Sequence, residues 1–116
     1  MYRGATEEFT LTFTLDADIS LIESYCLAFG KSENKSLVEV YEERNEDGVF
    51  ERASITEVGT SKTLKVMITE EESLKLKVGE IFVQLKISVM GKVLVSNQSS
   101  FEVFPSLCSS EMEEHE

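Results

Sequence analysis

Apolar and polar residues alternate along much of this chain, and a period of two residues indicates half-buried β-strands. Residues 8–15 ("EFTLTFTL") place apolar side chains at every odd position from Phe9 to Leu15 and threonine at the even positions between. Residues 80–89 ("EIFVQLKISV") carry a large aliphatic residue at every second position from Ile81 to Val89. Further strands are predicted in the other segments of this character: 24–30, 37–44, 49–58, 60–69 and 93–104.

Turn residues separate these segments. Residues 45–48 ("NEDG") favour a tight turn, because Asp-Gly tolerates positive φ. We therefore expect 37–44 and 49–58 to form one hairpin, whose charged outer positions suit an exposed or edge sheet. Residues 90–92 ("MGK") predict a second turn, and the strand that follows it contains a polar interruption.

Three consecutive glutamates interrupt the strand pattern in residues 69–74 ("TEEESL"). Thr69 and Glu72 have the spacing of a capping box, in which the hydroxyl and the carboxylate each accept from the other residue's amide. The glutamates would then occupy the first turn of a helix, where negative charge suits the helix dipole. This spacing predicts a single helical turn near residues 70–76, with an irregular acidic loop as the alternative.

The residues after this turn are expected to return the chain to the core. Leu74 and Leu76 can face inward, and Gly79 permits the reversal into the next strand. If Leu74 fills the core, truncating it to alanine should cost about 2–4 kcal/mol.

Together these segments predict an all-β protein, an immunoglobulin-like β-sandwich of about seven strands with one short helical turn. An antibody-type domain is disfavoured, because the chain has no tryptophan and no suitable Cys–Trp–Cys spacing. We expect a flexible N-terminus at residues 1–7, the sandwich at 8–104 and an acidic, disordered tail at 105–116.

The net charge of the chain limits the classes of partner that it is expected to bind. Twenty-two acidic residues face eleven basic ones, so the formal net charge is −11. Such a surface repels nucleic-acid phosphate and anionic lipid, and we expect neither nucleic acid nor membrane as a partner. The sequence shows neither a signal peptide nor an apolar run long enough to cross a bilayer. These observations predict synthesis in the cytoplasm.

Candidate chemistry is sparse. Cys26 lies in an apolar run and is expected to be a buried core thiol, and a disulfide with Cys108 is disfavoured without secretion. His115, near the end of the tail, makes a catalytic triad improbable. Asp16 and Asp18, with Ser20, are spaced like the first ligands of a calcium loop, but the downstream glycine and glutamate are missing. An Asx turn explains that stretch equally well.

No phosphate-binding glycine motif is present, and no pair of carboxylates is singled out for acid–base chemistry. We therefore predict no catalytic residues, no metal or cofactor site, and no enzymatic activity.

Residues 63–103 carry a distinctive order of motifs. A strand runs into Thr-Glu-Glu-Glu-Ser, then come two spaced leucines and a glycine, a Val-Gln-Leu-Lys-Ile strand, a glycine hairpin, and Ser-Asn before the last strand. The residues concerned are Thr69, Glu70, Glu71, Glu72, Ser73, Leu74, Leu76, Gly79, Val83, Gln84, Leu85, Lys86, Ile87, Gly91, Ser96 and Asn97.

This order resembles small virion-associated β-sandwich proteins of phages and prophages of Gram-positive bacteria. It is similar in strand order to the N-terminal immunoglobulin-like domain of phage baseplate upper proteins. Residues 9–31 also look like the opening strand, acidic turn and second strand of that family. Glu70 stands where glutamine is commoner, and the resemblance carries no catalytic residues.

The resemblance implies a non-enzymatic phage or prophage structural or assembly protein of the tail, baseplate or head. Its partners would be other virion or tail proteins, with a homo-oligomer as a further possibility. It would lie in the cytoplasm of the bacterial host and then in the virion. The alternative is a stand-alone bacterial module that binds protein or carbohydrate, although a sugar site normally shows exposed aromatic residues.

Overall fold

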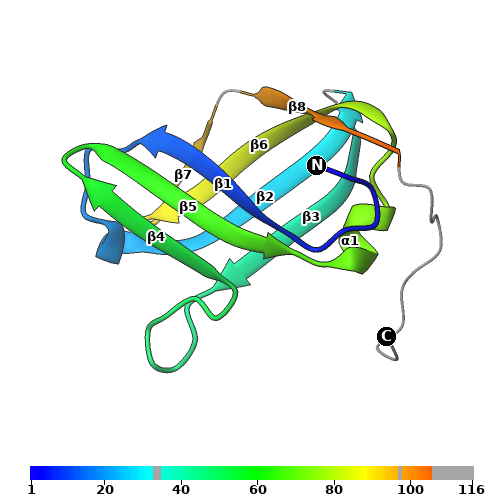
Figure 1. The fold of residues 1–116 in the computed structure, drawn as a ribbon. Helices are drawn as coiled ribbons and strands as arrows, with labels where there is room; N and C mark the ends of the chain where they lie inside the picture. The colour runs from blue at the N-terminus through cyan, green and yellow to red at the C-terminus, as the bar shows by residue number, and fades with distance from the viewer. Residues whose placement is uncertain (33–34, 97, 106–116) are drawn as a thin grey trace.

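The computed structural model describes residues 1–32, 35–96 and 98–105, which form two antiparallel β-sheets packed face to face (Figure 1). One sheet has the strand order β1-β5-β4. The other has the order β3-β2-β6-β7, and β8 also pairs with β6. The strands are β1 (Glu7–Thr14), β2 (Ile22–Ser32), β3 (Lys35–Glu43), β4 (Ala53–Val58), β5 (Ser61–Ile68), β6 (Gly79–Val89), β7 (Lys92–Val95) and β8 (Ser99–Val103).

The strand order is that of an immunoglobulin-like sandwich. β1, β4 and β5 take the places of strands B, D and E, while β2, β3 and β6 take those of C, C′ and F. β7, which ends at Val95, and β8, which begins at Ser99, together take the place of strand G. The predicted all-β sandwich is thus confirmed. In the described part of the chain no strand stands beside β1 in the place of strand A.

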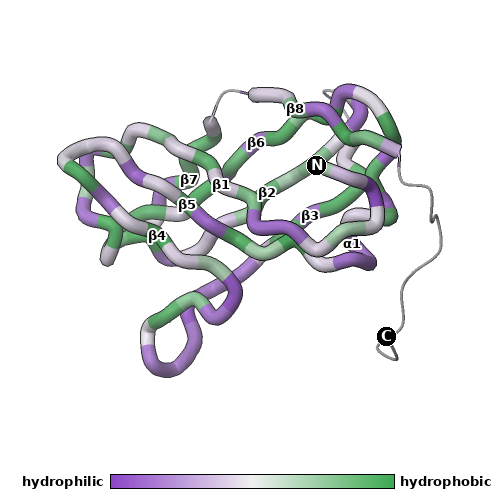
Figure 2. The backbone as a smooth tube through the Cα atoms, viewed as in Figure 1, coloured by the Kyte–Doolittle hydropathy of each residue, from purple (hydrophilic) through white to green (hydrophobic). Residues whose placement is uncertain are grey.

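The predicted alternation places the core between the sheets. Leu64, Val66 and Ile68 of β5 are buried, as are all the odd residues of β6 from Ile81 to Val89. Figure 2 shows the corresponding mixture of hydrophobic and hydrophilic residues along these strands, and a largely hydrophilic loop between β3 and β4. Aliphatic side chains and Phe29 make up most of this core, and Tyr25 is buried among them.

The turn at residues 90–91 joins β6 to β7 and was correctly expected. Val89 pairs with Lys92, so Met90 and Gly91 are the two loop residues of a hairpin. Their φ angles are +51° and +80°. Positive φ at both positions is what a type I′ turn requires, and glycine adopts it without steric cost.

The predicted hairpin of 37–44 with 49–58 is wrong. β3 pairs with β2, and β4 pairs with β5 in the opposite sheet. The Asn45–Gly48 turn does form, with the Gly48 amide donating to the Asn45 carbonyl at 2.9 Å. After the turn, however, the chain crosses from one sheet to the other before β4 begins at Ala53.

In the part of the chain that the structure describes, two short helical turns lie outside the strands: η1 (Ile19–Leu21) and α1 (Glu70–Leu74). α1 confirms the capping box. The Glu72 amide donates to the Thr69 hydroxyl at 3.1 Å, and the Thr69 amide donates to the Glu72 carboxylate at 3.0 Å. The irregular acidic loop is therefore excluded.

Of the two leucines that were expected to face the core, only Leu76 is fully buried. Leu76 is 1% exposed and belongs to the core, whereas Leu74 is only half-buried and lies against Gly4. Ser73 is the fully buried residue of α1. The core plug is therefore Leu76, not Leu74.

Ser73 connects α1 to the N-terminal residues. Its hydroxyl accepts from the Gly4 amide at 2.8 Å and donates to the Tyr2 carbonyl at 3.2 Å. Arg3 donates from Nε to the Leu76 carbonyl at 2.9 Å, and Tyr2 forms a parallel bridge with Phe104. Residues 1–4 thus join α1 to the end of β8. The expected flexibility of residues 1–7 stays a prediction, as do the domain bounds.

The corrected roles of the two leucines give a stability prediction. Leu76→Ala should lower the free energy of unfolding by about 2–4 kcal/mol, because it empties a fully buried site. Leu74→Ala should cost about 1 kcal/mol, because its side chain keeps part of its contact with water. Urea denaturation of both variants measures the difference. Equal losses would contradict the assignment of Leu76 as the plug.

Candidate functional site

The stretch from Asp16 to Ser20, whose spacing is like that of the first calcium ligands, contains the N-cap of a short helical turn. The Asp18 carboxylate accepts from the Ser20 amide at 3.1 Å and so caps η1. This is the Asx-turn alternative. Among the described residues no group of three or more histidines, cysteines, aspartates or glutamates could hold a metal ion.

Cys26 was predicted to be a buried core thiol, and this prediction is wrong. Cys26 is half-buried on the outer face of β2, opposite Tyr41 of β3 and Lys86 of β6. Its neighbours Tyr25 and Leu27 are the residues that face the core, both with no exposed surface. Burial raises the pKa of the Cys26 thiol, so the thiol is less reactive than a free one. Cys108 and His115 lie outside the described residues.

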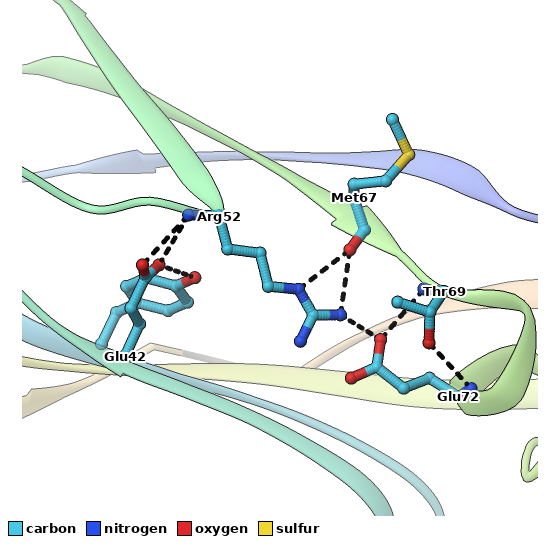
Figure 3. A network of polar contacts seen from close by, with 6 residues as sticks. Glu42, Arg52, Met67, Thr69 and Glu72 are labelled. Carbon is cyan, nitrogen blue, oxygen red and sulfur yellow. Dashed lines mark hydrogen bonds and ion pairs between the residues drawn. The ribbon is translucent and has the colours of Figure 1, made fainter.

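The main polar arrangement of the structure joins the two sheets and starts at Glu42 (Figure 3). Glu42 stands on β3 at the same inward phase as the buried Val38 and Val40. Its carboxylate accepts from the buried Tyr25 hydroxyl at 2.8 Å and from the backbone amide of Arg52 at 3.0 Å. The Glu51 amide donates to the same carboxylate. Glu42 therefore holds the chain where it crosses between the sheets.

Arg52 extends this network to α1. Its guanidinium donates to the Met67 carbonyl, from Nε at 3.1 Å, and forms an ion pair with Glu72. Glu72 is the residue that also closes the capping box with Thr69. A line of charge-assisted contacts thus runs from β3 through Arg52, just before β4, to the helical turn (Figure 3).

The surroundings of the network keep Tyr25 protonated and Glu72 ionised. Burial, followed by the hydrogen bond to Glu42, raises the pKa of Tyr25 far above its usual value, so the hydroxyl remains a donor. Burial also acts to raise the pKa of Glu72. The hydrogen bonds from Arg52 and Thr69 outweigh burial, and the pKa of Glu72 ends below its usual value. Both groups are held in the states that preserve the contacts, an arrangement that stabilises the fold and does not suit proton transfer.

A shallow, open groove lies where the ends of β2 and β3 meet η1. It is lined by Ser20, Ile22, Glu23, Ser24, Tyr41, Glu43, Arg44 and Ser88. The charged groups there already have partners within the chain. Arg44 donates to the Ile22 and Gly48 carbonyls at 2.7 and 2.8 Å, and Glu43 accepts from the Tyr41 hydroxyl at 2.7 Å. This groove can offer a contact surface, but its polar groups are committed to the fold.

The edge strand β7 exposes three consecutive apolar residues. Val93, Leu94 and Val95 of β7 are 62%, 42% and 55% exposed. Leu94 and Val95 lie beside the end of β1 around a notch of about 90 Å³ between the sheets, together with Phe13, Thr14, Leu15, Leu85, Ile87 and Ser96. These edges supply contact surface that a partner chain could cover.

Sequence reasoning missed the network around Glu42. One signal was available, because Val38 and Val40 define the inward phase of β3 and Glu42 continues it. A carboxylate at an inward position needs buried partners. Nothing in the sequence pointed to the backbone amides of Glu51 and Arg52 as those partners, because in the expected hairpin residues 49–58 would pair with the backbone of 37–44 and not with a side chain.

The sequence matches no protein-family model and no curated protein. No helix in the described part of the chain has the length and apolar character needed to cross a membrane.

The pKa of Glu72 gives a testable pH dependence. Glu72→Gln keeps the capping geometry, which accepts glutamine, but loses the charge that pairs with Arg52. At about pH 7 we expect the free energy of unfolding to fall by about 1 kcal/mol. A carboxylate whose folded pKa is depressed stabilises above its unfolded pKa, near 4.5, and loses this effect as the pH falls further. The difference between wild type and variant should therefore shrink below that pH.

Urea titrations across this range measure the effect. Glu71→Gln is the matched control, since Glu71 is an exposed carboxylate of the same turn and no ion pair joins it to Arg52. A loss that is equal for both variants, or independent of pH, would contradict the role of the Arg52–Glu72 pair.

Proposed function

We propose that this chain is a non-enzymatic structural or assembly protein of a phage or prophage, and that it acts through protein–protein contacts in a tail, baseplate or head. The observation that carries the proposal is the order of motifs in residues 63–103, which resembles small virion-associated proteins. In the fold this run makes five consecutive elements: β5, α1, β6, β7 and β8. The matched motifs therefore form one uninterrupted stretch of the chain, which contributes strands to both sheets.

The residues within that run have structural roles, which supports reading them as a unit. Thr69 and Glu72 cap α1, Leu76 fills the core, and Gly79 has φ +112° at the start of β6. Such a φ favours glycine strongly. A sequence pattern built from fold-determining residues and no catalytic group suits a protein whose task is to present a surface.

Surface charge is consistent with assembly on a specific partner. The net charge of −11 produces mutual repulsion and limits non-specific association. Binding would then depend on local complementarity, such as strand pairing at a sheet edge or a basic partner surface. The expected sites of action are the cytoplasm of the bacterial host and then the virion.

The gene's neighbours and the particles themselves test the proposal. Flanking capsid, portal or tail genes are expected. After prophage induction, purified particles should contain the protein at a fixed ratio to the major tail or capsid protein, measured by quantitative mass spectrometry. A frameshift early in the gene should remove it from particles, while a synonymous recoding of the same codons should not.

Metabolic neighbours together with absence from purified particles would overturn the phage assignment. They would favour the alternative, a stand-alone bacterial module that binds protein or carbohydrate.

A further inference from the structure

β1 is a long edge strand with one side open. Its eight residues pair with β5 in a continuous antiparallel register from Glu7 opposite Ile68 to Thr14 opposite Ser61. No strand of the described chain pairs with its other side. In an immunoglobulin-like sandwich that side belongs to strand A. The register contains no bulge, so the open edge is regular over its whole length.

The protective features of edge strands are sparse on β1. Proteins usually guard such edges with lysine, proline, bulges or charges. Residues 9–13 read Phe-Thr-Leu-Thr-Phe and contain none of these. β3, a long edge of the other sheet, carries Glu39, Glu42 and Glu43 and has irregular register near Gly30. β7 is only four residues long.

The side chains of β1 that face the core are incompletely covered. Phe9, Leu11 and Phe13 are all half-buried, whereas Leu27 and Leu85 of the central strands are 0% and 2% exposed. The notch of about 90 Å³ opens beside Phe13. This is less than the ~150 Å³ engineered cavity that accepts benzene, so the notch suits one aliphatic side chain. A strand added to β1 would cover both features.

The sequence of β1 identifies a second copy of the same strand as that addition. Residues 9–13 are a palindrome about Leu11. Antiparallel pairing about a two-fold axis at Leu11 brings Phe9 opposite the partner copy's Phe13, and Thr10 opposite its Thr12. Aromatic–aromatic and Thr–Thr pairs are favourable cross-strand neighbours. We propose that two copies of this chain form a dimer in which β1 pairs with β1 about Leu11, continuing the three-stranded sheet across the two-fold axis.

Backbone geometry agrees with that register. The Leu15 amide donates to the Thr60 carbonyl, so the odd residues of β1 direct their amides toward β5. Backbone direction alternates along a strand, and the even residues therefore direct theirs to the open edge. The two threonines then form hydrogen-bonded pairs across the axis. Leu11 and the phenylalanines fall at non-hydrogen-bonded pairs, where side chains lie closest.

Charge is also compatible with the register. Glu8 comes opposite Thr14 of the second copy and Glu7 opposite Leu15, so no carboxylate of the strand faces another. The remaining repulsion comes from the net charge of −11 on each copy. Salt screens such repulsion over about 10 Å at 0.1 M. The dimer should therefore tighten as the salt concentration rises, the opposite of an interface held by ion pairs.

Cross-linking tests the register. In a full-length Cys26→Ser/Cys108→Ser background, Leu11→Cys places the new thiol opposite the same thiol of the second copy. The Cα separation of such a pair is about 4.5 Å, within the range of a disulfide. Mild oxidation should give a covalent dimer on non-reducing gels. Ile55→Cys on β4 is the control, since Ile55 is also inward-facing and half-buried on an edge strand of the same sheet, and it should stay monomeric. Faster cross-linking by Phe9→Cys or Phe13→Cys would overturn the register.

Analytical ultracentrifugation measures the dissociation constant of the non-covalent dimer and so tests whether the open edge of β1 is the interface. Thr10→Lys/Thr12→Lys puts lysine opposite lysine and should weaken the dimer about tenfold or more. Ser54→Lys/Thr56→Lys makes the same charge change at exposed positions of β4 and should leave the dimer unchanged or tighter. A strict monomer at all concentrations, with no cross-link at Leu11, would overturn the proposal and leave the edge for a strand of another protein.

This inference deepens the proposed contact function and rests on it for its biological meaning, but the two can fail separately. A monomer that still enters phage particles would overturn the dimer alone. A dimer that is absent from particles would overturn the phage assignment alone.

Discussion

The structure depends most on a carboxylate that faces inward. Glu42 ends the inward row of β3 and would be costly there without partners. The Tyr25 hydroxyl and the backbone amides of Glu51 and Arg52 supply those partners. Because two of the donors belong to the crossing segment, satisfying the carboxylate and routing the chain to the second sheet are the same event.

The helical turn follows from that routing. With its backbone fixed by Glu42, Arg52 extends its side chain to Glu72 and the Met67 carbonyl. Glu72 already closes the cap with Thr69, so the same carboxylate serves the turn and the connection to β4. α1 in turn presents Ser73 to the N-terminal residues. A five-residue helix too short to be stable alone is thus held by its capping box, by Arg52 and by the N-terminal residues.

The strands and their inward faces could be predicted from the sequence, because alternation in β1, β5 and β6 records which side is buried. The cap at Thr69 was also predictable, since it depends on residues three positions apart. The hairpin of 37–58 was not, because alternation identifies strands but not their partners. Cys26 was misplaced because Tyr25, Cys26 and Leu27 are consecutive apolar residues, and such a run hides the phase of the strand.

The palindrome at residues 9–13 of the candidate contact surface is visible in the sequence. The sheet topology was needed to show that this strand, β1, lies at an edge. A self-complementary strand in the centre of a sheet would carry no meaning for association. The polar network could not be predicted as a whole, because it joins residues of β2, β3, β5, α1 and the segment before β4 that are close only after the crossing is made (Figure 3).

The pairing of β6 has a consequence for the order in which the chain folds during synthesis. β6 pairs with β2, far back in the sequence, and with β7 and β8. The β4–β5 hairpin can form as soon as it leaves the ribosome, and so can β2 with β3. The five-stranded sheet must wait until β6 emerges, so β2 spends translation with one edge unpaired. Such an edge is open to non-native pairing. Slow translation before β6 would prolong this interval.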